Sequence, residues 1–214
     1  FDTSIGWRFT NPRLAARENA TLSMPETAEE VARRDGITRE EADAFALRSQ
    51  QRAVAAIDAG RFDAEIVAVP TPAGEVSVDE GPRRETTAEA LAALRPVVAG
   101  GAVVTAGNAS SLNDGASAVI VASGEAVRRY GLVPRARVVT STSAALAPEI
   151  MGLGPVESSR RALANAGMTI GDMDLVEINE AFAAQVLPPA EQLGVDLDRL
   201  NVRGGSIAVG HPFG

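Results

Sequence analysis

The chain has 214 residues and a net charge of −8, and it contains one His, His211, and no Cys. All of its basic residues are Arg, and none lies in a basic run longer than two residues. Phosphate backbones need clustered positive charge, so the charge pattern argues against nucleic acid as the main partner. A thiolate site needs Cys, a Schiff base needs Lys, and an ordinary zinc site needs Cys or several His, so the composition excludes these three site types within the chain.

The first 22 residues have the scattered Pro, Gly and Asn of an irregular segment. Ser23–Glu26 forms a capping box with Pro25 inside it, which predicts a helix start. Thr38–Glu41 forms a second capping box and opens a long amphipathic helix that Gly60 closes. Small and apolar residues follow helical spacing along this second helix, at Ala42, Phe45, Ala46, Ser49, Ala53 and Ile57.

Two short strands and a third helix are predicted next. Residues 66–69 and 75–79 are strand candidates, and residues 70–74 between them have turn composition. Thr86–Glu89 predicts the start of a helix that ends near Pro96.

Beyond Gly100 the charge falls and short apolar runs alternate with helical stretches. Helices are predicted at Pro155–Ala166, ended by Gly167, and at Ala181–Leu193. Pro188-Pro189 lies inside the second of these, so that helix is expected to stop or kink near Leu187. Strands are predicted at residues 102–105, 116–122, 137–140 and 174–178.

This alternation of strands and helices is typical of a layered α/β domain. We place a boundary near residue 112, between a charged, helical, inserted region and the α/β core that follows. No run of roughly 18 apolar residues occurs, and no basic-then-apolar leader is visible, so we expect neither a membrane span nor a secretory signal, and a cytoplasmic location.

Asn179-Glu180-Ala181-Phe182 stands where a predicted strand turns into a helix. Ligands of α/β sheets bind at the carboxyl ends of strands, where an Asn can hold a water or a carbonyl group. The alternative is structural, since Asn is a good helix N-cap and Glu suits a first turn.

His211 ends a glycine-rich stretch, Gly204 to Pro212. Glycine lets a backbone approach a ligand closely, and Pro212 restricts His211 to extended conformations. A structural His and a catalytic His are both compatible with this pattern. The small-residue loop Thr105–Gly115 would suit a slot for a thin ligand chain, and it would equally suit an ordinary tight turn.

These segments together resemble the thiolase family. The resemblance rests on NEAFAAQ, GGSIAVGHPFG and TAGNASSLNDGASA, with support from IMGLGP, SMPETAEEVA and DAFALRSQQRA. IGWRFTNP and SMPETAE are similar to the β-ketoadipyl-CoA thiolase branch of aromatic-acid catabolism. The resemblance covers the whole chain.

The resemblance implies a layered α/β/α/β/α thiolase fold with an inserted α/β loop domain. Residues 1–112 would be the loop domain that covers CoA, 113–134 the end of the N-terminal half, and 135–214 the beginning of the C-terminal half. It also implies reversible acyl transfer between β-ketoacyl-CoA and CoA. CoA would be a co-substrate, with no permanently bound cofactor and no metal, and the protein would form a homodimer or homotetramer.

The family pattern assigns catalytic roles to two matching positions. His211 would activate a Cys thiolate and donate to an oxyanion hole, and Asn179 would hold the water that completes this hole. Both catalytic Cys of the family are expected outside these 214 residues, so the chain resembles the middle of a longer protein and should be inactive alone.

Binding roles follow in the same way. The resemblance places Ser110 and Ala106 at the pantetheine arm of CoA, and Met24, Met151 and Phe182 along the thioester channel.

The resemblance places Arg83 at the nucleotide end of CoA. Arg8 is a separate candidate, because a ketoadipyl substrate has a free carboxylate that an Arg can bind bidentately.

Two other functions remain open. One is a thiolase-like protein that binds acyl-CoA without turnover, which the presence of Asn179 and His211 argues against. The other is a serine hydrolase that uses His211, although the sequence lacks the G-x-S-x-G elbow of such enzymes.

Overall fold

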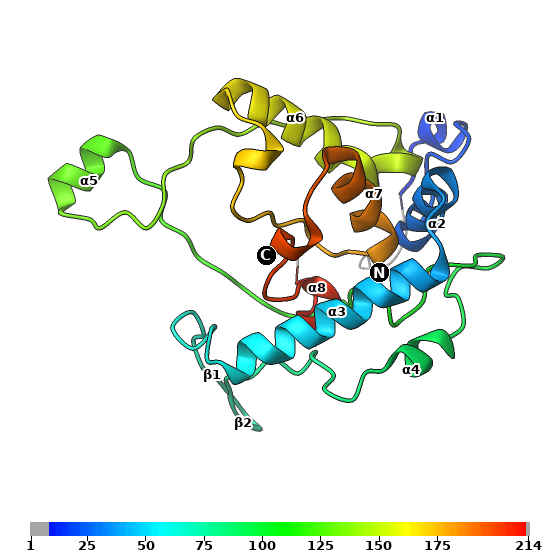
Figure 1. Ribbon diagram of the computed structural model, residues 1–214, viewed down its shortest axis with the longest axis horizontal. Coiled ribbons are helices and arrows are strands. Elements are labelled where there is room, and N and C mark those ends of the chain that lie inside the picture. The colour runs from blue at the N-terminus through cyan, green and yellow to red at the C-terminus, as the bar shows by residue number, and fades with distance from the viewer. Residues whose placement is uncertain (1–8, 213–214) are drawn as a thin grey trace.

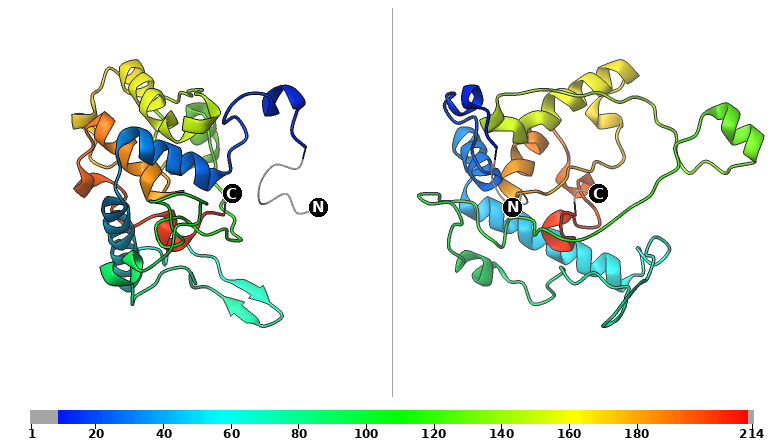
Figure 2. Two further views of the ribbon diagram at one scale, coloured as in Figure 1. Left: turned by 90° about the vertical axis from the view of Figure 1, so that its right-hand side faces the viewer. Right: turned by 180° about the vertical axis from the view of Figure 1, so that it is seen from behind.

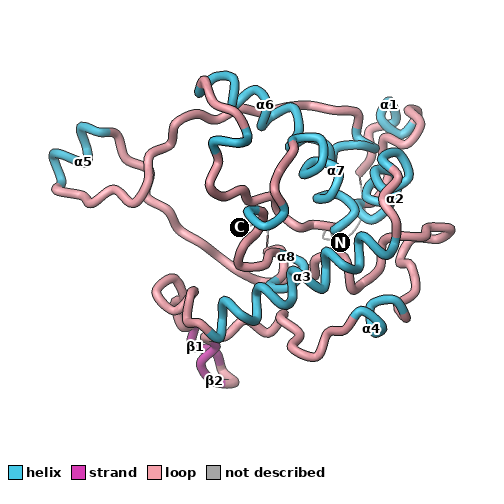
Figure 3. Tube along the Cα trace, viewed as in Figure 1, coloured by secondary structure: helices cyan, strands magenta, loops and turns pink. Residues whose placement is uncertain are grey.

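The computed structural model describes residues 9–212 of the chain, and helices account for most of its regular structure (Figures 1 and 3). The α-helices are α1 (Pro12–Ala15), α2 (Met24–Asp35), α3 (Arg39–Asp58), α4 (Ala88–Ala92), α5 (Gly124–Tyr130), α6 (Gly154–Ala166), α7 (Ala183–Leu193) and α8 (Ser206–Val209). Short 3-10 helices are η1 (Pro148–Leu153), η2 (Ile170–Asp172) and η3 (Leu197–Arg199), and the strands are β1 (Val69–Thr71) and β2 (Gly74–Val76).

The first long helices begin and end where the sequence predicts. The Glu26 carboxylate accepts from the backbone N–H of Ser23 at 2.6 Å, which starts α2. Hydrogen bonds with the Ser23 side chain and then with its backbone lower the Glu26 pKa. The Thr38 hydroxyl accepts from Glu41 N at 3.2 Å, and Glu41 accepts in return from Thr38 N at 2.8 Å, which starts α3. Both capping boxes are confirmed, and Gly60, at φ 63°, follows the end of α3.

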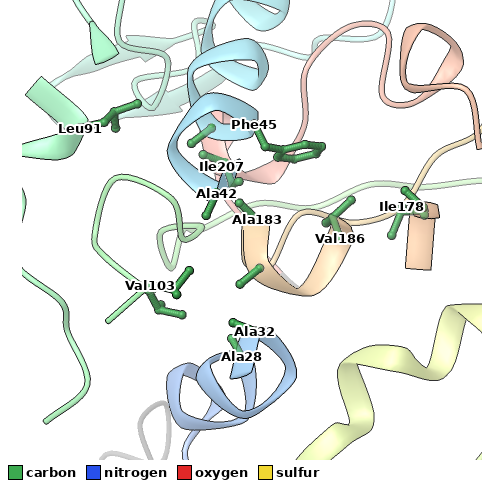
Figure 4. Close-up of a cluster of buried hydrophobic side chains, with 14 of the residues drawn as sticks. Ala28, Ala32, Ala42, Phe45, Leu91, Val103, Ile178, Ala183, Val186 and Ile207 are labelled. Atoms are coloured by element: carbon green, nitrogen blue, oxygen red, sulfur yellow. The ribbon is translucent and has the colours of Figure 1, made fainter. Parts of the chain in front are cut away.

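The core lies where α2, α3 and α7 meet, and Figure 4 shows side chains from all three in one cluster. Ala32 of α2, Phe45 of α3 and Val186 of α7 are buried there, together with Ile207 of α8. Most members of the cluster are Ala or Val, and such small side chains let helix backbones approach closely. The packing therefore fixes α3, α7 and α8 relative to one another.

The strands predicted at 102–105, 116–122, 137–140 and 174–178 are wrong for the residues that the structure describes. A strand needs a hydrogen-bonded neighbour, and within residues 9–212 these segments form at most isolated bridges, Pro96 with Thr105 and Val176 with Leu200. The chain after residue 113 instead leaves the body of the molecule as a long loop with α5 at its tip, as the front and rear views show (Figures 1 and 2). It returns at α6, where the Thr142 hydroxyl donates to Ser158 O at 2.6 Å. Val119, Ile120 and Val121 on this loop are 84–85% exposed.

The predicted hairpin exists, with shifted strands. β1 and β2 pair antiparallel, with Val69 opposite Val76 and Thr71 opposite Gly74. β1 therefore begins at residue 69 rather than 66 and ends at 71 rather than 69, and β2 begins at 74 rather than 75 and ends at 76 rather than 79. Gly74 has φ 127°, so the chain reverses at Pro72 and Ala73 in a shorter turn than predicted.

The stop predicted near Leu187 is also wrong, because α7 continues through Pro188 and Pro189 to Leu193. Both proline rings are fully buried. The fixed φ of proline is helical, so the cost is limited to lost N–H donors and local crowding. Burial of both rings against the core offsets that cost, and Gly194, at φ 70°, ends the helix.

Of the two remaining helix predictions, that of α6 agrees with the structure at both ends and that of α4 agrees at its start. α6 ends at Ala166 with Gly167 in the left-handed conformation at φ 66°. Thr87 caps α4 through Ala90 N at 3.2 Å, although α4 ends at Ala92, before Pro96. None of the helices described between residues 9 and 212 is long and apolar enough to cross a bilayer.

Gly204 provides a test of how tightly the glycine turn packs on α3. It has φ 75°, and a Cβ there would lie 2.5 Å from Ser49 O and 2.7 Å from Ala53 N. Gly36 has a similar φ of 72° and nothing within 4 Å of its Cβ position, so it is a matched control. Gly204→Ala should lower the free energy of unfolding by about 3 kcal/mol or more, and Gly36→Ala by roughly 1–2 kcal/mol.

Urea denaturation of both variants measures the difference. If both variants lost the same free energy of unfolding, the result would contradict close packing of the glycine turn on α3.

Candidate active site

The segment before α7 is held in place by the segment that follows η3. Val176 N donates to Arg199 O at 3.0 Å, and Asn201 N donates to Val176 O at 3.0 Å. The buried Asn201 side chain then binds both backbone groups of Ile178, with its Oδ1 accepting from Ile178 N at 2.9 Å and its Nδ2 donating to Ile178 O at 2.8 Å. These bonds fix the backbone directly before Asn179.

Glu180 is almost fully buried, with 1% of its surface exposed. Its carboxylate accepts from the Ser49 hydroxyl at 2.5 Å, from Asn201 Nδ2 at 2.9 Å and from Ile207 N at 3.3 Å. Gly205 lies so close that a Cβ there would be 2.6 Å from Glu180 Oε2. Glu180 therefore ties α3, the loop before α7 and the glycine turn together, and the interpretation of Glu180 as a first-turn helix residue is wrong.

Asn179 does not cap α7, because Phe182 occupies the N-cap position and makes no side-chain capping bond. The Asn179 amide instead lies between two polar side chains. Its Oδ1 accepts from the Ser206 hydroxyl, and its Nδ2 is 3.3 Å from His211 Nε2. The capping interpretation is therefore wrong, and the Asn179 side chain is free to serve the site.

His211 is placed by the loop that precedes residue 113. His211 N donates to Ser111 O at 3.1 Å, and His211 and Leu112 form a parallel bridge. Gly210 before it has φ 94°, a conformation that side chains rarely adopt, so the turn requires glycine there. The small-residue loop and the histidine turn thus lie side by side.

Asn108 organises the small-residue loop from inside. It is fully buried; its Oδ1 accepts from Thr105 N at 2.8 Å, and its Nδ2 donates to Asp43 Oδ1 at 2.8 Å and to Val103 O at 2.9 Å. The backbone of Ser110 continues the connection, since Ser110 N donates to Ala181 O at 2.9 Å. The loop is therefore anchored both to α3 and to the segment that carries Asn179.

A cavity of about 680 Å³ opens between these segments, α2 and the start of α6. Its walls are mostly apolar, and His211 is the titratable side chain among the described residues that line it. The predicted site residues that line it are Met24, Ala106, Ser110, Met151, Asn179, Phe182 and His211.

Arg83 is not among the lining residues. Its side chain is exposed, and its backbone N–H donates to Gln50 Oε1 at 2.8 Å. Gln50 also donates to Ile207 O at 3.3 Å, so Arg83 lies near the glycine turn but outside the cavity. Its neighbour Arg84 pairs bidentately with Asp58 at 2.6 and 2.9 Å. Arg8 lies outside the described residues.

Glu177, Glu180 and Arg203 are not among the residues that line the cavity. Burial raises the pKa of Glu177, the nearby Glu180 raises it further, and Arg203 opposes both effects. The cavity itself joins an imidazole and a carboxamide in apolar surroundings, where hydrogen bonds to a developing negative charge are strong. Such a site is suited to chemistry at a carbonyl group.

The sequence pattern did not identify Glu180, Asn201, Asn108 or Ser206 as site residues. Burial of an acid or an amide depends on contacts distant in sequence, and Ser49 is separated from Glu180 by 131 positions. Ser206 carried one signal, a lone hydroxyl inside a glycine-rich turn.

Family models identify the class of protein. The model of the thiolase N-terminal domain matches residues 12–125, and that of the thiolase C-terminal domain matches residues 132–214. The chain belongs to the thiolase family, as its motifs indicated.

Individual relatives of similar sequence are also thiolases or acetyltransferases. The chain is 50% identical over 221 residues to a 3-oxoadipyl-CoA/3-oxo-5,6-dehydrosuberyl-CoA thiolase of Escherichia coli strain K12, a match that covers all of this chain and 55% of that protein. It is 52% identical over 193 residues to an acetyl-CoA acetyltransferase of Pseudomonas aeruginosa, covering 88% of this chain and 49% of that protein.

Solved structures give the same result. The crystal structure of human mitochondrial 3-ketoacyl-CoA thiolase in complex with CoA matches with a TM-score of 0.88 and 46% identity, over 92% of this chain and 50% of that one. The chain thus has the thiolase fold, and it spans about half the length of these relatives.

Replacement of Glu180 tests the buried network. Glu180→Gln would set an amide N–H₂ against donors that now meet a carboxylate, so it should lower the free energy of unfolding by about 2–3 kcal/mol. Glu191→Gln, on the exposed face of α7, is the matched control and should change it by less than about 0.5 kcal/mol. Urea denaturation measures both, and a Glu180→Gln variant as stable as the control would show that the carboxylate does not hold the segments together.

Proposed function

We propose that this chain supplies the general base and part of the oxyanion hole of a thiolase, which transfers acyl groups between β-ketoacyl-CoA and CoA. His211 is the base and Asn179 a donor-holding residue of the oxyanion hole. One observation carries this proposal: Asn179 Nδ2 and His211 Nε2 lie 3.3 Å apart at the wall of an apolar cavity of about 680 Å³.

The same observation favours an enzyme over a protein that only binds acyl-CoA. A binding protein needs apolar walls and a slot for the pantetheine arm, and it has no use for an imidazole and an amide directed at one point. Here both groups are positioned by the buried Glu180 network and by the bond from His211 N to Ser111 O. Such preorganised polar groups are the usual source of stabilisation for a developing oxyanion.

The nucleophile is a Cys thiol that reaches the cavity from outside these 214 residues, which contain no Cys. A thiol has a pKa of about 8.5, so a neighbouring imidazole is needed to take its proton near neutral pH. His211 Nε2 would accept this proton, and the acyl carbonyl oxygen would then meet donors held by Asn179.

CoA would enter the apolar cavity that Asn179 and His211 line. Ser110 and Ala106 would contact the pantetheine arm, while Met24, Met151 and Phe182 would surround the thioester, and all of them line the cavity. Arg83, exposed near the glycine turn, would meet the nucleotide end, where an acidic protein needs local positive charge.

The proposed function also implies a division of the chain into domains. Residues 1–112 would form the loop domain over CoA, 113–134 the end of the N-terminal half, and 135–214 the beginning of the C-terminal half. The protein would act in the cytoplasm as a homodimer or homotetramer. The names of several relatives support β-ketoadipyl-CoA as the substrate, cleaved to succinyl-CoA and acetyl-CoA.

Thiolysis by the intact gene product that contains these residues tests the activity. The intact protein should cleave acetoacetyl-CoA or β-ketoadipyl-CoA, and the loss of substrate absorbance measures this cleavage. Asn179→Ala should lower kcat by about 10²–10³-fold, as loss of an oxyanion-hole donor does. His211→Ala should lower it by about 10²–10⁴-fold, as loss of a general base does.

Circular dichroism controls for folding of these variants. CoA binding without any thiolysis by the wild-type protein would instead support the protein that binds without turnover.

Replacement of Arg83, with its neighbour Arg84 as the control, tests binding of the nucleotide end of CoA. Arg83→Ala should raise KM for CoA roughly fivefold, the upper value for one solvent-exposed ion pair. Arg84→Ala should have less effect because Arg84 already pairs with Asp58. Neither change should alter KM for pantetheine, which lacks the nucleotide. An equal effect of Arg83→Ala on both substrates would remove Arg83 from the nucleotide site.

A further inference from the structure

One acidic side chain of α2 is bonded to the backbone of a segment far away in the sequence. The Glu29 carboxylate accepts from three consecutive backbone N–H groups. Its Oε1 accepts from Val104 at 2.7 Å and from Val103 at 3.0 Å, and its Oε2 accepts from Ala102 at 3.3 Å. Gly101 leaves room for the carboxylate, since a Cβ there would lie 2.6 Å from Glu29 Oε1. Bonds to an ionised group are stronger than neutral ones, so this contact is a firm anchor.

The segment that Glu29 holds is a narrow reversal of the chain, residues 96–105. Pro96 and Thr105 form an antiparallel bridge at its base, and Val97 N donates to Val104 O at 2.9 Å. Buried backbone donors need partners, and in a sheet a neighbouring strand would supply them. Here the Glu29 carboxylate takes the place of that strand.

Glu29 connects two walls of the cavity without lining it. One wall is the face of α2 formed by Met24, Thr27, Ala28 and Val31. The other wall includes Val97, within the reversal, and Ala106 and Ser110, which follow it in the chain. The bonds from Glu29 therefore set the separation between these two walls.

The other anchors of the site do not involve Glu29. Thr105 N donates to Asn108 Oδ1 at 2.8 Å, and the Asn108 amide also binds α3. The bonds that hold the segments of Asn179 and His211 run through the Glu180 network and the small-residue loop. Loss of Glu29 would therefore release one wall of the cavity and leave the amide and the imidazole in place.

We propose that Glu29 is a positioning residue that holds the 96–105 reversal against α2, and so fixes the width of the cavity where the pantetheine arm of CoA lies. This role rests on the proposed function, which places the arm beside Ala106 and Ser110. A wall that is already ordered lowers the free-energy cost of ordering the site when CoA binds. Glu29 itself need not touch CoA.

Glu29→Ala, made in the intact gene product that contains these residues, removes all three bonds. Each bond to a charged group is worth roughly tenfold or more in an equilibrium. The reversal should therefore open, and a smaller fraction of the molecules should have the slot in its binding-competent form. The Kd for CoA, measured by calorimetry, should rise roughly tenfold or more.

Steady-state kinetics separate this role from a general loss of stability. Glu29→Ala should raise KM for CoA and for pantetheine by the same factor, because both molecules carry the arm. The kcat should stay within about twofold of the wild-type value, because Asn179 and His211 keep their anchors. A variant that was merely less stable would show a lower kcat, from fewer active molecules, and an unchanged KM.

Glu30→Ala is the matched control. Glu30 is the next residue of the same helix, and its carboxylate binds the Arg33 side chain at 2.5 and 2.9 Å. This control should leave the Kd for CoA unchanged. Glu29→Gln keeps the shape of the side chain and one acceptor oxygen, so it should raise Kd by roughly threefold. It keeps the test decisive if Glu29→Ala does not fold.

Hydrogen exchange, followed by mass spectrometry, measures release of the wall without turnover. Peptides that cover residues 102–104 should exchange roughly tenfold faster in Glu29→Ala than in the wild-type protein. Peptides that cover Ser110, whose N–H donates to Ala181 O at 2.9 Å, should exchange at the wild-type rate.

A folded Glu29 variant with wild-type exchange at residues 102–104, or with the wild-type Kd for CoA, would overturn the inference. An equal rise in Kd for Glu30→Ala would also overturn it, because the effect would then not depend on the bonds to the reversal. Absence of thiolysis by the wild-type protein would refute the proposed function instead. Exchange and CoA binding need no turnover, so the two failures are distinguishable.

Discussion

The buried carboxylate of Glu180 is the constraint on which the rest of the site depends. A charge removed from water is costly unless hydrogen-bond donors surround it. Here the donors are the Ser49 hydroxyl, the Asn201 amide and Ile207 N, which come from α3, the segment after η3 and α8. Because the carboxylate needs all of them, segments far apart in sequence are held at one point.

The geometry of the candidate site follows from this anchor. Asn179 precedes Glu180, and the glycine turn that leads to His211 closes directly over the carboxylate at Gly205. Any side chain at Gly205 would collide with Glu180, so the glycine is needed for the approach of the turn rather than for flexibility. The 3.3 Å contact between Asn179 and His211 is therefore set by a group that does not line the cavity.

The sequence predicts those parts of the fold that depend on neighbours along the chain. The capping boxes at Ser23 and Thr38 and the terminal Gly167 act over a few residues, and their helices form as expected. Strand pairing and proline burial depend on distant contacts, so the strand predicted at residues 116–122 and the stop predicted for α7 near Leu187 were wrong. At the site, the motifs indicated Asn179 and His211, whereas the burial of Glu180 leaves no local signal.

The apolar walls give the few polar groups of the cavity their effect. In such surroundings a hydrogen bond to a charged oxygen is stronger than in water, and a misdirected one is correspondingly more costly. Asn179 and His211 are among the few polar side chains that line the cavity. Because the Glu180 network and the bond from His211 N to Ser111 O hold the segments that carry them, the cavity presents its amide and its imidazole in one fixed arrangement.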